Sequence, residues 1–163
     1  MSEKLNRSSG SSVSVQRLPQ VKSPASTAVS DYDSIDLVRE MVKAADERKA
    51  GDITVLDVAE ISYITEYFMI VTGFSTTQIR AIARSVENRA EELFNRVPEQ
   101  VEGMSDGGWI LLDYGAVIIH VFLPQEREFY DIEAFWGHAE KLDISAFLEL
   151  DADAATNMGS AEP

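Results

Sequence analysis

One stretch of this chain constrains its fold more than any other. Residues 109 to 122 read Trp-Ile-Leu-Leu-Asp-Tyr-Gly-Ala-Val-Ile-Ile-His-Val-Phe. Two apolar runs rich in branched residues flank a break at residues 113–116, and this pattern predicts a β-hairpin. The first run opens on Trp109, and the second contains His120, one of the two histidines of the chain. The hairpin is therefore either a pair of catalytic strands or part of a recognition surface.

Hydrophobic periodicity on both sides of the hairpin predicts further helices and strands. Asp33 can cap a first helix, and Ser75 and Gln78 form a capping-box pattern for a second, whose buried stripe includes Leu93. A third helix follows the hairpin, and its spacing predicts that Phe129 is buried. The expected helices cover residues 33–50, 75–95 and 124–137, with another turn or two in 139–150, and the expected strands cover 53–58, 67–72, 101–103, 109–114 and 116–122.

This order of elements predicts a single α/β domain with a mixed five-stranded sheet flanked by helices, over residues 31–145. Residues 1–30 are basic, rich in serine and without apolar periodicity, which predicts a disordered leader. An organelle transit peptide is the alternative for this segment. The acidic composition of residues 146–163, rich in small side chains, predicts a disordered tail.

Charge narrows the choice of partners. The chain has 28 acidic and 14 basic residues, a formal net charge of −14. The first 30 residues carry +3, so the remainder carries −17. A body this acidic is repelled by phosphate backbones, which argues against strong nucleic-acid binding. It suits a basic protein surface, although acidity that serves only solubility remains the alternative.

Two further global features limit the class of protein. The chain has no cysteine, which removes disulfides and thiolate chemistry and fits a reducing, cytoplasmic compartment. No apolar run approaches the ~20 residues that a membrane-spanning helix needs, so no membrane contact is expected.

Catalytic chemistry is weakly supported. Asp52, Asp57 and Asp113 lie in or beside strands and could hold Mg²⁺, but no Asp-x-Asp pair occurs in the predicted core strands. No glycine-rich phosphate-binding motif is present either. Capping of turns explains these aspartates better, and a buried structural role explains His120 better than catalysis does.

Trp109 is the one residue for which periodicity leaves two roles open. On an extended strand its side chain shares a face with Leu111 and Asp113, while Ile110 and Tyr114 belong to the other face. Large apolar groups on the outer face of such a strand often anchor an interface. Trp109 is therefore either a core residue or an interface anchor.

Seven short motifs lie in order along residues 35–143. They are Asp52-Ile53-x-Val55-Leu56-Asp57-Val58, Ile64-Thr65-x-Tyr67-Phe68, Val71-Thr72-Gly73-x-Ser75, Val101-Glu102-Gly103, Trp109-Ile110-Leu111-Leu112-Asp113-Tyr114-Gly115, His120-Val121-Phe122, and Arg127-x-Phe129-Tyr130-x-Ile132-Glu133-x-x-Trp136-Gly137. Together they resemble the ribosomal silencing factor family (RsfS, or Iojap). One position departs: the family usually has Asp after the Tyr-Gly pair, where this chain has Ala116.

The resemblance implies a nucleotidyltransferase-like topology without transferase activity, hence no enzyme and no cofactor or metal. It implies binding to the large ribosomal subunit, through the ribosomal protein numbered fourteen, at the face that meets the small subunit. Such binding would block subunit association and repress translation under nutrient or energy limitation. The partner-binding role carries over to Trp109, Ile110, Asp113 and Tyr114.

The resemblance also implies a possible homodimer when the protein is free, in the cytoplasm or alternatively in an organelle stroma or matrix. Two rival functions are a Mg²⁺-dependent nucleotidyltransferase-like enzyme that uses Asp57 and Asp113, and a homodimerising structural module.

Overall fold

The computed structural model describes residues 32–105 and 107–149, and the predicted leader and the tail from residue 150 lie outside the described residues. The helices are α1 (Ser34–Glu47), α2 (Thr76–Phe94), α3 (Pro124–Tyr130) and α4 (Ile132–Phe135), and the strands are β1 (Gly51–Asp57), β2 (Tyr67–Thr72), β3 (Gln100–Glu102), β4 (Trp109–Asp113), β5 (Val117–Phe122) and β6 (Glu140–Lys141). The predicted α/β class is confirmed.

The sheet is mixed, as predicted, but it has six strands within the described residues, not five. Their order is β3-β4-β5-β2-β1-β6. β2 and β5 pair in parallel, and every other neighbouring pair is antiparallel. The sixth strand, β6, pairs with β1 through only two residues, too few for any periodicity to predict. The nucleotidyltransferase-like topology stays a prediction.

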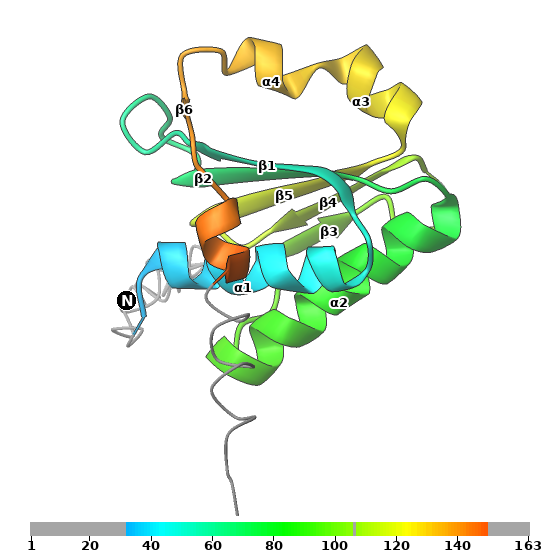
Figure 1. The fold of residues 1–163 in the computed structure, drawn as a ribbon, viewed down its shortest axis with the longest axis horizontal. Helices are drawn as coiled ribbons and strands as arrows, with labels where there is room; N and C mark the ends of the chain where they lie inside the picture. Colours follow the sequence, from blue (N-terminus) through cyan, green and yellow to red (C-terminus); the bar gives the residue numbers. More distant parts are fainter. Residues whose placement is uncertain (1–31, 106, 150–163) are drawn as a thin grey trace, which may run out of the picture. The chain divides into compact units, whose positions relative to one another are not determined.

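Helices lie on both faces of the sheet (Figure 1): α1 and α2 on one, α3 and α4 on the other. The larger core lies between the sheet and α1–α2, and a smaller core that includes Phe68 and Phe122 lies on the opposite side. Because both faces of the central strands are covered, β5 is buried along its whole length. β4 instead alternates between buried and half-buried side chains.

The two long helices begin where the sequence predicts. Asp33 is the N-cap of α1, and Ser75 caps α2 by accepting a hydrogen bond from the backbone N–H of Gln78 at 3.0 Å. The Gln78 side chain reaches back one residue further than a capping box requires, since its Oε1 accepts from the backbone N–H of Phe74 at 2.8 Å.

Two predicted core residues are on the surface. Leu93 is 55% exposed, and its neighbour Phe94 packs on Tyr32 instead, with ring centroids 4.5 Å apart. Phe129 is 81% exposed, because the predicted third helix is two short helices. Asp131 between them has a left-handed backbone with φ of 42°, so residues on either side do not share one helical stripe.

The folded segment runs past its expected end at residue 145. Residues 145–149 are helical, and Phe147 is buried in the larger core. None of the described helices is long and apolar enough to cross a membrane.

Candidate partner-binding surface

The outer face of β4 carries a row of three half-buried side chains: Trp109, Leu111 and Asp113. The alternate residues point into the larger core, where Ile110 and Tyr114 are both 0% exposed. The sequence prediction of which residues share a face is thus confirmed. Of the four predicted partner-binding residues, Trp109 and Asp113 reach the surface, whereas Ile110 and Tyr114 support it from beneath.

The Trp109 side chain is fixed by contacts with neighbouring aromatic rings and by one hydrogen bond. Its indole Nε1–H donates to Nδ1 of His120 at 3.0 Å. Its ring stacks on Phe122, with centroids 5.0 Å apart, and packs against Tyr130 of α3 at 4.6 Å. A fixed, partly exposed aromatic side chain is what an interface anchor requires, because little rotamer freedom remains to be lost on binding.

The loop that precedes Trp109 depends on one glycine. Gly103 has φ of +84°, and a Cβ there would lie 1.9 Å from the Trp109 carbonyl oxygen, so no other residue fits. Arg80 of α2 holds the same loop, as its Nε donates to the Met104 carbonyl oxygen at 2.9 Å. The start of β4 is therefore positioned from two sides.

His120 has the buried role that its apolar strand predicts. It is 5% exposed, and burial lowers the pKa of its imidazole to about 4. The ring is therefore neutral at pH 7. Because Nδ1 accepts the hydrogen bond from Trp109, the single ring proton belongs on Nε2.

The two aspartates of the enzyme rival cap turns, as predicted. Asp57 Oδ1 accepts from the backbone N–H of Ala59 at 3.1 Å, and Asp113 Oδ1 accepts from that of Gly115 at 2.8 Å. β5 and β2 lie between their strands, which separates the two strands by three spacings, or about 14 Å. That distance is too long for the two carboxylates to share one metal ion.

Carboxylates border the outer row of β4. Gln100 and Glu102 of β3 pair with Asp113 and Leu111, so their side chains share the outer face. The Gln100 amide donates to Glu102 Oε1 at 2.6 Å. The β3 edge of this face therefore carries negative charge and side chains that can form hydrogen bonds with a partner.

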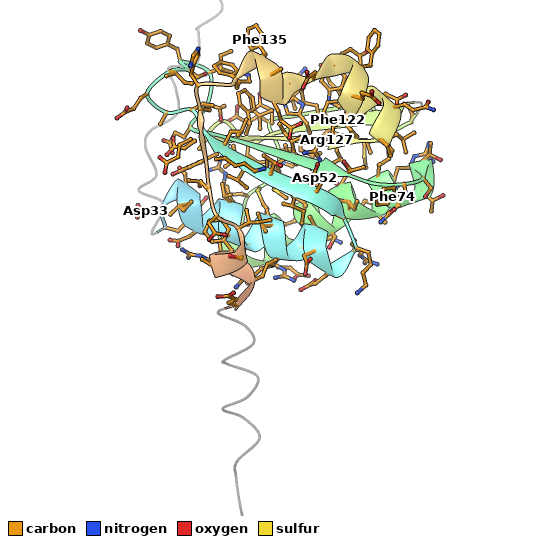
Figure 2. All side chains as sticks on the ribbon, turned by 45° about the horizontal axis from the view of Figure 1, so that its top comes forward. Asp33, Asp52, Phe74, Phe122, Arg127 and Phe135 are labelled. Carbon is orange, nitrogen blue, oxygen red and sulfur yellow. The ribbon has the colours of Figure 1, made fainter. Side chains whose placement is uncertain are left out.

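Exposed aromatic rings lie on the helices next to this row. Phe129 and Phe135 are each 81% exposed, and Tyr130 is 49% exposed. Figure 2 shows Phe135 on the outer side of α4, pointing away from the sheet. Apolar rings exposed together and bordered by carboxylates are typical of a surface that meets another macromolecule.

Arg127 attaches α3 and α4 to the sheet. Its guanidinium is nearly buried (Figure 2) and pairs with Glu133 of α4, with Nη2 2.7 Å from Oε1 and Nε 3.3 Å from Oε2. It also donates to the Asp52 carbonyl oxygen at 2.6 Å, to Thr72 Oγ1 at 2.9 Å and to Thr54 Oγ1 at 3.2 Å. The hydrogen bonds from Arg127 to Glu133 lower the pKa of the Glu133 carboxyl below its ordinary value.

A bulge in β1 makes the Arg127 site possible. The register of β1 shifts between Gly51 and Thr54, and Asp52 within this shift has φ of 43°. Such a bulge turns backbone groups away from the ladder, and here the Asp52 carbonyl accepts from Arg127. The sequence analysis did not predict that Arg127 attaches the helices to the sheet. One signal was present: Arg127 is the only basic residue in the segment 126–133, which is otherwise rich in acidic residues.

Ala116, the position that departs from the family pattern, is partly buried against the larger core. Its carbonyl oxygen accepts from the backbone N–H groups of Glu66 and Tyr67, both at 3.1 Å. These contacts use backbone atoms alone, so the hairpin turn needs no side-chain acceptor at this position.

Tyr114 carries a buried hydroxyl with no hydrogen-bond partner among the described residues. An unpaired buried hydroxyl costs about 1–3 kcal/mol, so we expect Tyr114→Phe to raise the free energy of unfolding by about 1 kcal/mol. Burial also raises the pKa of this phenol, which keeps it neutral. Urea denaturation of both proteins measures the difference, and a loss of 1 kcal/mol or more would show that the hydroxyl is paired.

The fold and this surface define the class of protein. It is a small α/β domain with a half-exposed aromatic face, and residues 32–105 and 107–149 contain no group of three or more side chains suited to a metal ion. A family model described as ribosomal silencing factor during starvation matches residues 31–162. The chain belongs to the ribosomal silencing factor family.

Relatives and solved structures agree with this assignment. The chain is 39% identical to the chloroplastic protein Iojap of Arabidopsis thaliana over 130 residues, 80% of this chain and 54% of that protein. It is 40% identical to the ribosomal silencing factor RsfS of Bacillus subtilis over 101 residues, 62% of this chain and 85% of that protein. The chain thus spans about half the length of the chloroplastic relatives.

Two crystal structures share the fold. A Chromobacterium violaceum protein superposes with a TM-score of 0.63 at 33% identity, covering 65% of this chain and 88% of that one. A Bacillus halodurans protein gives a TM-score of 0.59 at 31% identity, covering 67% and 98%.

Proposed function

We propose that this protein binds the large ribosomal subunit and represses translation by blocking subunit association when nutrients or energy are limiting. The binding surface is the outer face of β4 with α3, and the partner is the ribosomal protein numbered fourteen at the intersubunit face. The observation that carries the proposal is the fixed, half-exposed Trp109 at one end of an outer row that ends in Asp113 and has Glu102 beside its middle residue, in a chain of the ribosomal silencing factor family.

Electrostatics support a basic partner. Residues 31–163 carry a net charge of −17, and β3 and β4 add carboxylates beside the apolar row. Opposite fields speed encounter and select among partners, whereas the central apolar contact supplies most of the affinity. A protein surface in a ribosome, next to RNA phosphates, is typically basic.

The mechanism is steric and forms no covalent bond. A ligand that binds only the free large subunit shifts the joining equilibrium toward separate subunits, in proportion to its concentration relative to its Kd. The protein therefore needs an exposed, rigid surface and no catalytic group. Relatives occur in bacteria and in chloroplasts, so the compartment we propose is a bacterial cytoplasm or an organelle stroma or matrix.

Replacement of Trp109 tests the proposal. We expect Trp109→Ala to weaken binding to purified large subunits by about 30-fold or more, because truncation of a central aromatic anchor typically costs 2 kcal/mol or more. Cosedimentation through a sucrose gradient measures the binding, and the yield of joined subunits measures the silencing.

The matched control is Leu93→Ala, which removes a 55% exposed apolar side chain from α2, on the opposite face of the sheet. It should bind as the unaltered protein does. Wild-type affinity in Trp109→Ala would refute the anchor, and failure of the unaltered protein to sediment with large subunits would refute the function.

Self-association in the free state is a further part of the proposal. The loop between β1 and β2 exposes three large apolar side chains: Ile61, Tyr63 and Ile64. Exposed apolar groups of this kind favour contact between copies. Light scattering of the free protein over a range of concentrations tests this, and a mass that stays monomeric would contradict it.

A further inference from the structure

A small pocket lies on α3 beside Trp109. It encloses about 290 Å³ and is lined by Gln125, Glu126, Phe129 and Tyr130. Its aromatic wall is continuous with the partner-binding surface, since the Phe129 and Tyr130 rings meet edge to face at 5.1 Å and Tyr130 lies 4.6 Å from Trp109.

The carboxylate in this pocket has an unmet hydrogen-bonding capacity. Glu126 Oε2 is buried and has no hydrogen-bond donor among the described residues. The carboxyl group lies against Gly108, where a Cβ would come within 2.5 Å of Glu126 Cδ. A carboxylate with one buried, unpaired oxygen is costly to keep charged, so a cation that approaches the group from the pocket stabilises it more than it would stabilise a solvated glutamate.

The aromatic wall favours the same kind of ligand. The faces of Tyr and Phe rings carry partial negative charge and attract ammonium and guanidinium groups within about 6 Å. Phe129 is largely exposed and Tyr130 is half-exposed, so both have ring surface free for such a contact. A carboxylate next to exposed ring faces, on a strongly acidic body, is complementary to a single cation with an apolar stem.

We infer that this pocket receives one arginine or lysine side chain of the basic protein that the surface binds. The charged end meets the Glu126 carboxylate, and the aliphatic stem lies along Tyr130 and Phe129. This inference rests on the proposed function and names the chemistry of recognition at one point of the same surface. It makes Glu126 a specificity-determining residue and Trp109 the apolar anchor beside it.

The test compares two isosteric variants that remove the same charge from the same helix. Glu126→Gln removes the carboxylate in the pocket, and Glu128→Gln removes an exposed carboxylate that lines a different cavity. Binding to purified large ribosomal subunits is measured at several KCl concentrations. We expect Glu126→Gln to weaken binding by about tenfold or more and to flatten its salt dependence. Glu128→Gln should stay within about twofold of the unaltered protein.

A second pair of variants tests the aromatic wall. Tyr130→Phe keeps the ring and should keep the affinity, whereas Tyr130→Leu should lose about two- to fivefold. Equal binding by Glu126→Gln and Glu128→Gln, or by Tyr130→Phe and Tyr130→Leu, would overturn the inference while the proposed function stands. If the unaltered protein itself does not bind large subunits, the proposed function fails and the inference fails with it.

Discussion

Arg127→Met is expected to lower the free energy of unfolding by about 3–5 kcal/mol, because it leaves the partners of a buried cation unpaired. The hydroxyl oxygens of Thr54 and Thr72 would each lose the hydrogen bond that they accept from Arg127. The Asp52 carbonyl oxygen would lose the one that it accepts at 2.6 Å. Glu133 would lose both hydrogen bonds from the guanidinium. The melting temperature should fall on the order of 10 °C, and calorimetry measures it.

The matched control is Arg39→Met. Arg39 pairs with one carboxylate, Asp36 at 2.7 Å, in a partly exposed site on α1, where its guanidinium also lies 5.5 Å from the centroid of the Phe147 ring. A partly exposed pair and one cation–π contact together contribute about 1–2 kcal/mol, so this variant should lose clearly less stability than Arg127→Met. Equal losses for the two variants would contradict the role of Arg127 as the attachment of α3 and α4.

The position of Arg127 also connects stability to binding. α3 carries Tyr130, which packs against Trp109, and α4 carries Trp136, which packs against Phe68 with ring centroids 5.2 Å apart. When the guanidinium is lost, these short helices keep their apolar contacts with the smaller core, among them those of Ile132 and Trp136. The partner-binding surface therefore depends on a residue that is itself too buried to touch a partner.

Most of the fold could be predicted from the sequence, because its main elements have strong local signals. The nearly all-apolar run at residues 67–72 is a central strand, and the Ser75 cap begins α2 as expected. β6 and the division between α3 and α4 could not be predicted. The first has two residues, and the second depends on one left-handed residue, Asp131, inside an otherwise helical pattern.

The site was predicted in part, and the limit is physical. Alternation along β4 predicts correctly that Trp109 and Asp113 share a face, but it does not say which face is the buried one. That depends on α1 and α2 covering the side of Ile110 and Tyr114. Glu126 and Arg127 gave no periodic signal, because their roles come from contacts with residues distant in the sequence, at Gly108 and Asp52.

Stability should fall as the pH is lowered from about 6.5 to 4, through His120. Burial lowers the folded pKa of this imidazole to about 4, from its ordinary value of 6.5. Between these two values the unfolded chain binds a proton that the folded protein does not, so the free energy of unfolding decreases as the pH decreases. The full difference corresponds to roughly 3 kcal/mol, of which up to about 1.4 kcal/mol is lost per pH unit.

Two histidine variants separate this effect from general acid denaturation. His120→Gln removes the titrating group while Gln keeps an acceptor for the Trp109 indole, so the dependence between pH 6.5 and 5 should flatten. His138→Gln removes the exposed histidine and should leave the dependence in place. Urea denaturation at pH 5, 6 and 7 measures all three proteins, and an unchanged slope in His120→Gln would refute the assignment. The folded imidazole protonates only near pH 4, so the Trp109 N–H bond keeps its acceptor between pH 7 and 5, and His120 should not change the affinity for large subunits over that range.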